Sequence, residues 1–97
     1  MSTEELGLAP AAEAFLRAGR AERDLSPHTL DAYRSDLSQF VTWAERRGVS
    51  SVSQVERKAL RHFVGYLGTL GYSRRSMARK LSAVRSFFRW AVTHDLI

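Results

Sequence analysis

SRRSMARKLSAVRSFFRWA, residues 73–91, combines an apolar stripe and a basic stripe along one predicted helix. Ser73 is a favoured N-cap residue type, and no glycine or proline interrupts the segment that follows it. The apolar positions recur at the helical spacing of three and four residues, at Met77, Leu81, Val84, Phe88 and Ala91. We expect this apolar side to be buried against other segments of the chain.

The segment before Gly71 has an equally regular apolar stripe, at Leu60, Phe63, Val64, Leu67 and Leu70. Gly71 is expected to end this helix. Its start is open, because Ser53 and Glu56 can form a capping box whereas the apolar pattern begins only at Leu60.

Ser26 and Pro27 predict the start of a longer helix. Ser26 can accept a hydrogen bond as N-cap, and Pro27 fits the first turn, where a missing N–H has no effect. The helix is predicted to run to about Arg47, with Gly48 as a left-handed stop. Its core-facing positions are Leu30, Tyr33, Leu37, Phe40, Val41 and Ala44.

The first helix is predicted from about Pro10 to Glu22, with Phe15 and Leu16 as its main apolar contacts, after a flexible start at about residues 1–9. Four amphipathic helices with short connections predict an all-α, small four-helix bundle that forms a single domain over residues 1–97. The three tyrosines, Tyr33, Tyr66 and Tyr72, are expected to pack rather than react. Trp43 and Trp90 fall at the edges of apolar arcs, and we expect partial burial of both.

The charge of the chain is unevenly distributed. Residues 1–56 have six arginines against nine acidic residues, a balance of −3, whereas residues 57–97 have nine basic residues against Asp95, a balance of +8. A block this basic in a chain of ordinary composition is expected to meet an anionic surface, of which nucleic acid is the commonest.

The basic residues of segment 73–91 also share a side. At about 100° per residue they fall, with two serines, inside an arc of about 140° beside the apolar one. In angular order the members are Arg74, Arg85, Arg89, Ser82, Arg75, Ser86 and Arg79. Arginine offers charge for phosphates and a planar fork for guanine edges, so this arc is typical of a DNA-contacting helix.

Three alternatives compete with DNA binding. A solvated basic face that binds nothing is the simplest, although such faces usually mix both signs and no acid lies between Arg57 and His94. A membrane-surface helix is disfavoured, because the three other helices also need a core. The runner-up is a helical protein-interaction module whose basic face docks on an acidic partner.

Several classes of function find no support in the sequence. There is no cysteine, and His28, His62 and His94 have no metal-ligand spacing. The six glycines form no phosphate-binding loop, and no acid, base and nucleophile stand at a diagnostic spacing. We therefore expect no cofactor, no metal and no enzymatic activity of this domain. Without a membrane-length apolar run or a signal peptide, a cytoplasmic location is expected.

Two runs of residues resemble a known family. LSPHTLDAYRSDL, residues 25–37, is similar to the signature LSxxTLxAYxxDL of the tyrosine recombinase (phage integrase) family. GYSRRSMARKLSAVRSFFR, residues 71–89, resembles a stretch typical of Xer-type members, and Ser86-Phe87-Phe88 is closer to the C type than to the D type. The resemblance extends from about Phe15 to Ile97 and fits the N-terminal core-binding domain of those enzymes.

This resemblance implies a SAM-like fold of two crossed helix pairs that covers one face of a double-stranded DNA core site. A separate catalytic domain, absent from this chain, would hold the catalytic tyrosine, arginines, lysine and histidine. The parent protein would then be a site-specific recombinase acting in DNA integration or chromosome segregation. Its other protomers would join a synaptic tetramer, while the isolated domain is expected to be monomeric.

The resemblance also implies DNA contacts at individual positions. On the last helix the matching residues are Arg74, Arg75, Arg79, Lys80, Ser82 and Arg85, to which the basic arc adds Arg89. The start of the second helix contributes the backbone contacts Ser26, His28, Thr29 and Arg34. Lys80 lies nearer the apolar arc than the others, so its long stem would have to extend outward to reach DNA.

Overall fold

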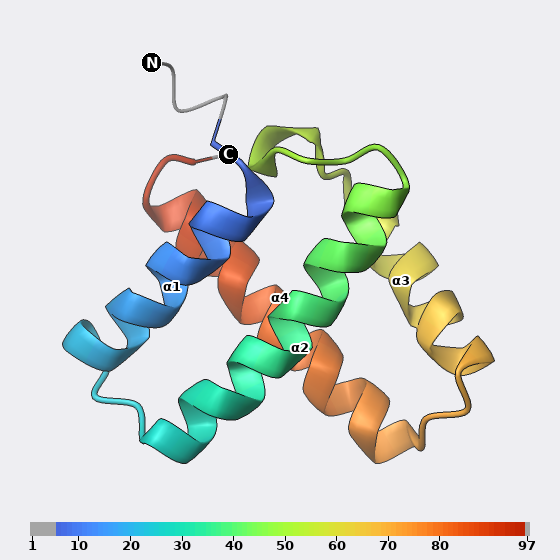
Figure 1. Cartoon of the computed structure of the whole chain (residues 1–97), viewed down its shortest axis with the longest axis horizontal. Coiled ribbons are helices and arrows are strands. Elements are labelled where there is room, and N and C mark those ends of the chain that lie inside the picture. The colour runs from blue at the N-terminus through green and yellow to red at the C-terminus, as the bar shows by residue number, and fades with distance from the viewer. Residues whose placement is uncertain (1–5, 97) are drawn as a thin grey trace.

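A computed structural model describes residues 6–96 of the chain, which form four α-helices and one short 3-10 helix (Figure 1). These are α1 (Leu8–Glu22), α2 (Pro27–Arg46), η2 (Val52–Gln54), α3 (Arg57–Thr69) and α4 (Arg74–Thr93). Within the described residues the only β-type pairing is an isolated bridge between Gly7 and Ser51. The predicted all-α fold is confirmed.

The helices form two antiparallel pairs that cross each other. α1 lies beside α2, and α3 beside α4, and in Figure 1 the green α2 passes in front of the orange α4 at the centre of the molecule. α1 also contacts α4, so α4 packs against each of the other three helices. Both α2 and α4 begin at the lower edge in this view, which brings two helix N-termini to one side of the fold.

The core is built largely from aromatic rings. Phe15, Phe40, Phe63 and Phe87 have almost no exposed surface, and each comes from a different helix. Phe15 meets Phe87 edge to face at 5.8 Å between ring centroids, which joins α1 to α4. Trp43 is buried rather than partly buried, whereas Trp90 has the expected partial burial. Tyr33 and Tyr66 pack against the core as predicted.

The predicted helix ends of α2 and α4 are confirmed in detail. The Ser26 hydroxyl accepts from the Thr29 N–H at 3.1 Å, and the Ser73 hydroxyl accepts from the Ser76 N–H at the same distance. Gly48 and Gly71 follow α2 and α3 with φ of +82° and +79°, a left-handed conformation that L side chains avoid.

The N-terminal segment is more ordered than expected. α1 begins at Leu8, not Pro10, and the Leu8 N–H donates to the Ser50 carbonyl at 2.8 Å while the Val52 N–H donates to the Leu6 carbonyl at 3.0 Å. Leu8 is fully buried, so these bonds hold residues 6–9 against the bundle instead of leaving them flexible. The expectation for residues 1–5 lies outside the described residues.

The entry to α3 also differs from the prediction. Residues 52–54 form a separate turn, η2, and the Gln54 side-chain oxygen accepts from the N–H groups of Ser50 and Ser51 at 2.9 and 3.1 Å. The open start of α3 thus lies at Arg57, and the capping box that the structure forms is that of Ser51 and Gln54, at the start of η2. Glu56 is the N-cap position of α3 but makes no side-chain capping bond.

The buried side of α4 is rotated relative to the predicted stripe. Its buried residues are Lys80, Ala83, Val84, Phe87 and Ala91. This set is centred about 60° away from the predicted apolar stripe. The reason is that α4 faces α1 and α2 as well as α3, so its interior side points to the crossing. The opposite edge of the stripe stays partly exposed. A second difference concerns Leu70 at the end of α3, which was expected in the core but is 48% exposed.

Candidate nucleic-acid interface

One side of α4 is opposite its buried residues and open to solvent. Four arginines and a serine there are exposed, and we call this set the basic face: Arg74, Arg75, Ser82, Arg85 and Arg89. Among residues 6–96, none of these arginines forms an ion pair. Arg89 makes one long bond to the Ser86 hydroxyl, at 3.4 Å. The basic face is thus a surface of available donors on a rigid helix.

Arg79 lies at the edge of the basic face, beside α2. Its Nε and Nη2 groups donate to the two carboxylate oxygens of Asp36 at 3.2 and 2.9 Å. The Arg79 side chain is nevertheless 55% exposed, whereas Asp36 has no exposed surface. Arg79 therefore has one side engaged inside the protein and another available outside it.

Lys80 is the predicted contact that the structure removes from the surface. Its side chain is only 8% exposed, and its ammonium group lies 3.3 Å from Asp36 Oδ1 and 4.7 Å from the centroid of the Tyr72 ring. The rotation of α4 turns this position toward α2, so the stem does not extend outward. Lys80 is accordingly a buried cation paired with a carboxylate.

The start of α2 presents hydroxyl groups and an imidazole. Besides capping the helix, the Ser26 hydroxyl donates to Thr29 Oγ1 at 3.0 Å, so its proton is used within the turn. The Thr29 hydroxyl proton remains available, and His28 is exposed beside it. The start of α2 stands at the same edge of the fold as the start of α4 (Figure 1).

Arg34 belongs to a different part of the surface. Its guanidinium pairs with the Glu13 carboxylate of α1, and it lines a shallow depression between α1 and α2 with Ala12 and Leu37. The structure does not bring Arg34 into the basic face, since it pairs with α1. The Arg34 side chain is 55% exposed, so the backbone contact predicted at this position stays a prediction.

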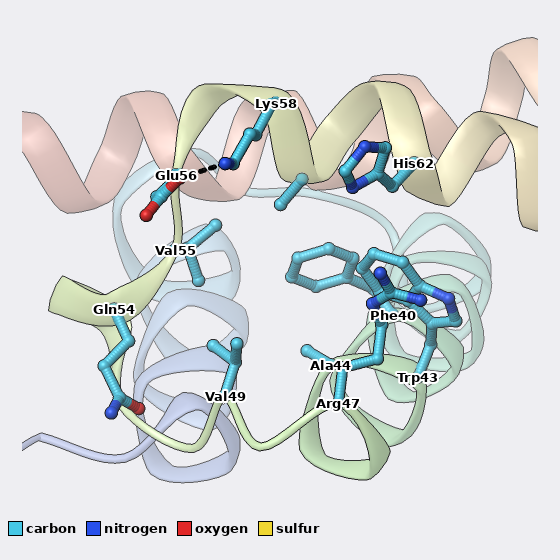
Figure 2. Close-up of a pocket in the computed structure, with 11 residues that line it drawn as sticks. Phe40, Trp43, Ala44, Arg47, Val49, Gln54, Val55, Glu56, Lys58 and His62 are labelled. Carbon is cyan, nitrogen blue, oxygen red and sulfur yellow. Dashed lines mark ion pairs between the residues drawn. The ribbon is translucent and has the colours of Figure 1, made fainter.

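A further cavity of about 310 Å³ lies between the end of α2 and the start of α3 (Figure 2). Trp43 forms one wall, with the Arg47 guanidinium 5.0 Å from its ring centroid, and the ion pair between Glu56 and Lys58 at 3.3 Å stands at the other side. His62 lines it without a carboxylate or nucleophile partner. This cavity has no arrangement for acid–base or nucleophilic chemistry.

Across residues 6–96 no cluster of three or more histidine, cysteine or acidic side chains stands close enough to hold a metal ion. Over the same residues, no helix combines the length and the apolar character needed to cross a membrane.

Comparison with known families settles the fold assignment. The family model described as "Phage integrase, N-terminal SAM-like domain" matches residues 12–95. The chain belongs to this family. The resemblance seen in the two sequence runs is therefore confirmed for nearly the whole SAM-like domain.

Tyrosine recombinases named XerC are among the relatives of this SAM-like domain. The chain is 42% identical over 87 residues to "Tyrosine recombinase XerC" of Xanthomonas campestris pv. campestris (strain B100), covering 90% of the chain and 27% of that protein. It is 44% identical over 78 residues to the protein of the same name from Pseudomonas aeruginosa (strain LESB58), covering 80% of the chain and 26% of that protein. The chain thus spans about a quarter of these relatives' length. No solved structure gave a significant match.

Asp36 is a buried acid of this SAM-like domain whose pairing with Arg79 and Lys80 the sequence analysis does not predict. It matches the acidic position of the family signature, but the match alone does not indicate a structural role. A physical signal was present, because Asp36 stands three residues after Tyr33 and four before Phe40, both on the core-facing side of α2. An acid at such a position requires a cationic partner, and the basic half of the chain supplies two, Arg79 and Lys80.

Proposed function

We propose that this domain binds double-stranded DNA at a recombination core site, as the non-catalytic N-terminal domain of a Xer-type site-specific tyrosine recombinase. The observation that supports this most is the basic face of α4, whose arginines have no ion-pair partner in the described residues. An arginine set without intramolecular acids is costly to keep on a surface unless an anionic partner uses it.

The dimensions of α4 fit the major groove. A helix of 20 residues is about 30 Å long and narrow enough to enter a groove about 12 Å wide. In the proposal, the buried side of α4 fixes its orientation on the bundle and the basic face meets the DNA. Arg85 and Arg89 pair with phosphates, and Arg74 and Arg75 in the first turn reach base edges or the adjacent backbone.

The start of α2 adds a second contact to the DNA backbone. Its first N–H groups and the positive end of its dipole favour a phosphate, and the free Thr29 hydroxyl proton can be donated to the same group. His28 stands at the same end. Because α2 and α4 begin at one edge of the fold, the two contacts can reach the same duplex (Figure 1).

Catalysis and assembly complete the proposal. Strand cleavage belongs to a separate catalytic domain, and the role of this domain is to hold one face of the core site while protomers assemble into a synaptic tetramer. In isolation the domain is a monomer that forms no covalent adduct with a nicked site. It acts in the cytoplasm, where the chromosome is.

The test is fluorescence anisotropy of a labelled duplex carrying a Xer-type core site. The double substitution Arg85→Ala with Arg89→Ala should weaken binding by about tenfold or more, because two phosphate contacts are lost. Arg17→Ala is the matched control, an exposed arginine on α1 outside the basic face, and it should change affinity little. Equal effects of both changes in folded protein would place the interface elsewhere.

One feature favours a second candidate, a protein-interaction module. Leu60, Phe88 and Val92 line an apolar groove beside Arg85 and Arg89, and a partner with an acidic, partly apolar surface would match it. Binding to such a partner would depend on Val92, which is 57% exposed, as well as on the arginines. DNA binding that falls steeply with salt and ignores Val92→Ser would favour the first candidate.

A further inference from the structure

We propose that Asp36 is a positioning residue for DNA binding, which fixes the Arg79 guanidinium so that its outer edge is presented to a phosphate. This inference rests on the proposed function and names a residue that does not itself reach the DNA. The starting observation is that a carboxylate with no exposed surface joins α2 to α4 through two cations.

The burial of Asp36 makes its bonds obligatory. A buried carboxylate without partners is strongly unfavourable, so its oxygens have to stay bonded in the folded protein. Oδ2 accepts from Arg79 Nε at 3.2 Å, while Oδ1 accepts from Arg79 Nη2 at 2.9 Å and from the Lys80 ammonium at 3.3 Å. Arg79 is thus held at two points, which removes the rotational freedom of its long side chain.

The bonding pattern leaves a defined part of Arg79 free. A guanidinium has five N–H donors, and Asp36 uses the one on Nε and one on Nη2. Two of the remaining three, one on Nη1 and one on Nη2, point from the edge formed by these nitrogens, which is an edge that binds a phosphate through two parallel hydrogen bonds. The 55% exposure of the Arg79 side chain shows that solvent, and hence a ligand, reaches it.

Lys80 gives the cluster of Asp36, Arg79 and Lys80 a net positive charge. Two cations share one carboxylate, so the three groups together have a formal charge of +1 and still attract a phosphate. Lys80 is itself held by the Tyr72 ring, and the Tyr72 hydroxyl accepts from Gln39 Nε2 at 3.1 Å. Since Tyr72 directly precedes the Ser73 cap, the same cluster fixes the start of α4 against α2.

Arg79 also lies on α4 at a position that continues the basic face. It follows Arg75 by four residues, so the two side chains are neighbours on α4, and Arg79 extends the basic face toward α2. A donor already held in its binding orientation loses less freedom when the DNA binds, which strengthens binding without any new contact.

The decisive experiment compares Asp36→Asn with Asp31→Asn in anisotropy measurements at fixed salt. Both changes raise the net charge by one, and on charge alone both should tighten DNA binding. The positioning role predicts the opposite sign for Asp36→Asn, a weakening of about fivefold to tenfold. Asp31 is exposed on the same helix and should show unchanged or tighter binding. Tighter binding by Asp36→Asn would overturn the inference.

A double-mutant cycle separates positioning from general stability. In an Arg79→Ala background, Asp36→Asn should cause no further loss of affinity, because the residue it positions is gone. Additive losses would overturn the inference. If Asp36→Asn does not fold, as judged by circular dichroism, Arg79→Lys decides, since lysine keeps the charge and the pairing but lacks the forked edge. Weakened binding of that variant supports the proposal, and wild-type affinity overturns it.

The failure of the proposed function would look different. If the wild-type domain binds no duplex even at low salt, DNA binding itself is wrong. If the wild type binds and only the Asp36 comparisons fail, DNA binding stands and Arg79 is a structural residue.

Discussion

Phe40 of α2 and Phe63 of α3 meet edge to face with ring centroids 5.1 Å apart, and neither side chain has exposed surface. Phe63 is one of the two fully buried residues of α3, with Leu67, so this contact anchors α3 to α2. An edge-to-face pair between two buried rings stabilises by more than its buried area alone.

Replacement of Phe63 by alanine should therefore lower the free energy of unfolding by about 3 kcal/mol or more. Urea denaturation followed by tryptophan fluorescence measures this directly, because Trp43 lies 5.2 Å from the Phe63 ring. Val64→Ala on the same helix is the control, and its effect should be clearly smaller, since Val64 is only partly buried. Similar losses for both would mean that Phe63 is not the anchor.

The two serine N-caps predict how the free energy of unfolding changes when each serine is replaced. Ser26→Ala and Ser73→Ala each remove an acceptor from the first turn of a helix, and each should lower the free energy of unfolding by about 1 kcal/mol. Ser38→Ala, at an exposed position inside α2, should be neutral or slightly stabilising, because alanine is the better helix former. Thermal denaturation of the three variants is the measurement, and a loss at Ser38 equal to that at the caps would count against the argument.

Two glycines should respond to alanine in opposite directions. Gly71 has φ of +79°, so Gly71→Ala should lower the free energy of unfolding by about 1 kcal/mol despite the open space around it. Gly65 lies inside α3, also in open space, and Gly65→Ala should raise it by up to about 1 kcal/mol. Urea denaturation measures both changes in the free energy of unfolding. Changes in the same direction would be inconsistent with the backbone conformations of Gly65 and Gly71.

The salt dependence of DNA binding separates surface cations from the buried one. If the four arginines of the basic face and Arg79 each neutralise a phosphate, log affinity should fall against log salt with a slope of about −4.5. Arg85→Ala should reduce the magnitude of this slope by about 0.9. Lys80→Met should leave it unchanged, because the Lys80 ammonium is engaged by Asp36 inside the protein. A slope change for Lys80→Met would return that residue to the interface.

Local signals predicted much of this fold correctly. Ser26-Pro27 located the start of α2, Ser73 the start of α4, and Gly48 and Gly71 the turns, because each depends on a hydrogen bond or a φ value that its own neighbours determine. The pairing of helices was also accessible, since short connections require antiparallel neighbours.

The orientation of α4 and the fate of Lys80 could not be predicted in the same way. An apolar stripe defines a range of rotations, and the neighbours that pack on the helix choose one of them. For α4 the choice depends on contacts with α2, where Asp36 attracts Lys80. These two residues are 44 positions apart in the chain, and a helical wheel does not include such a contact. The ion pair of Arg34 could not be predicted for the same reason, since its partner Glu13 lies on another helix.

The contact of Phe15 with Phe87 has a consequence for how the protein is made. Their rings are 5.8 Å apart, so the first helix of the chain completes its burial only against the last one. A nascent chain that has emerged only as far as α3 has the Phe15 side chain without the partner that covers it. Folding of this domain on the ribosome is therefore expected to finish late, after α4 has left the exit tunnel, and not helix by helix during synthesis.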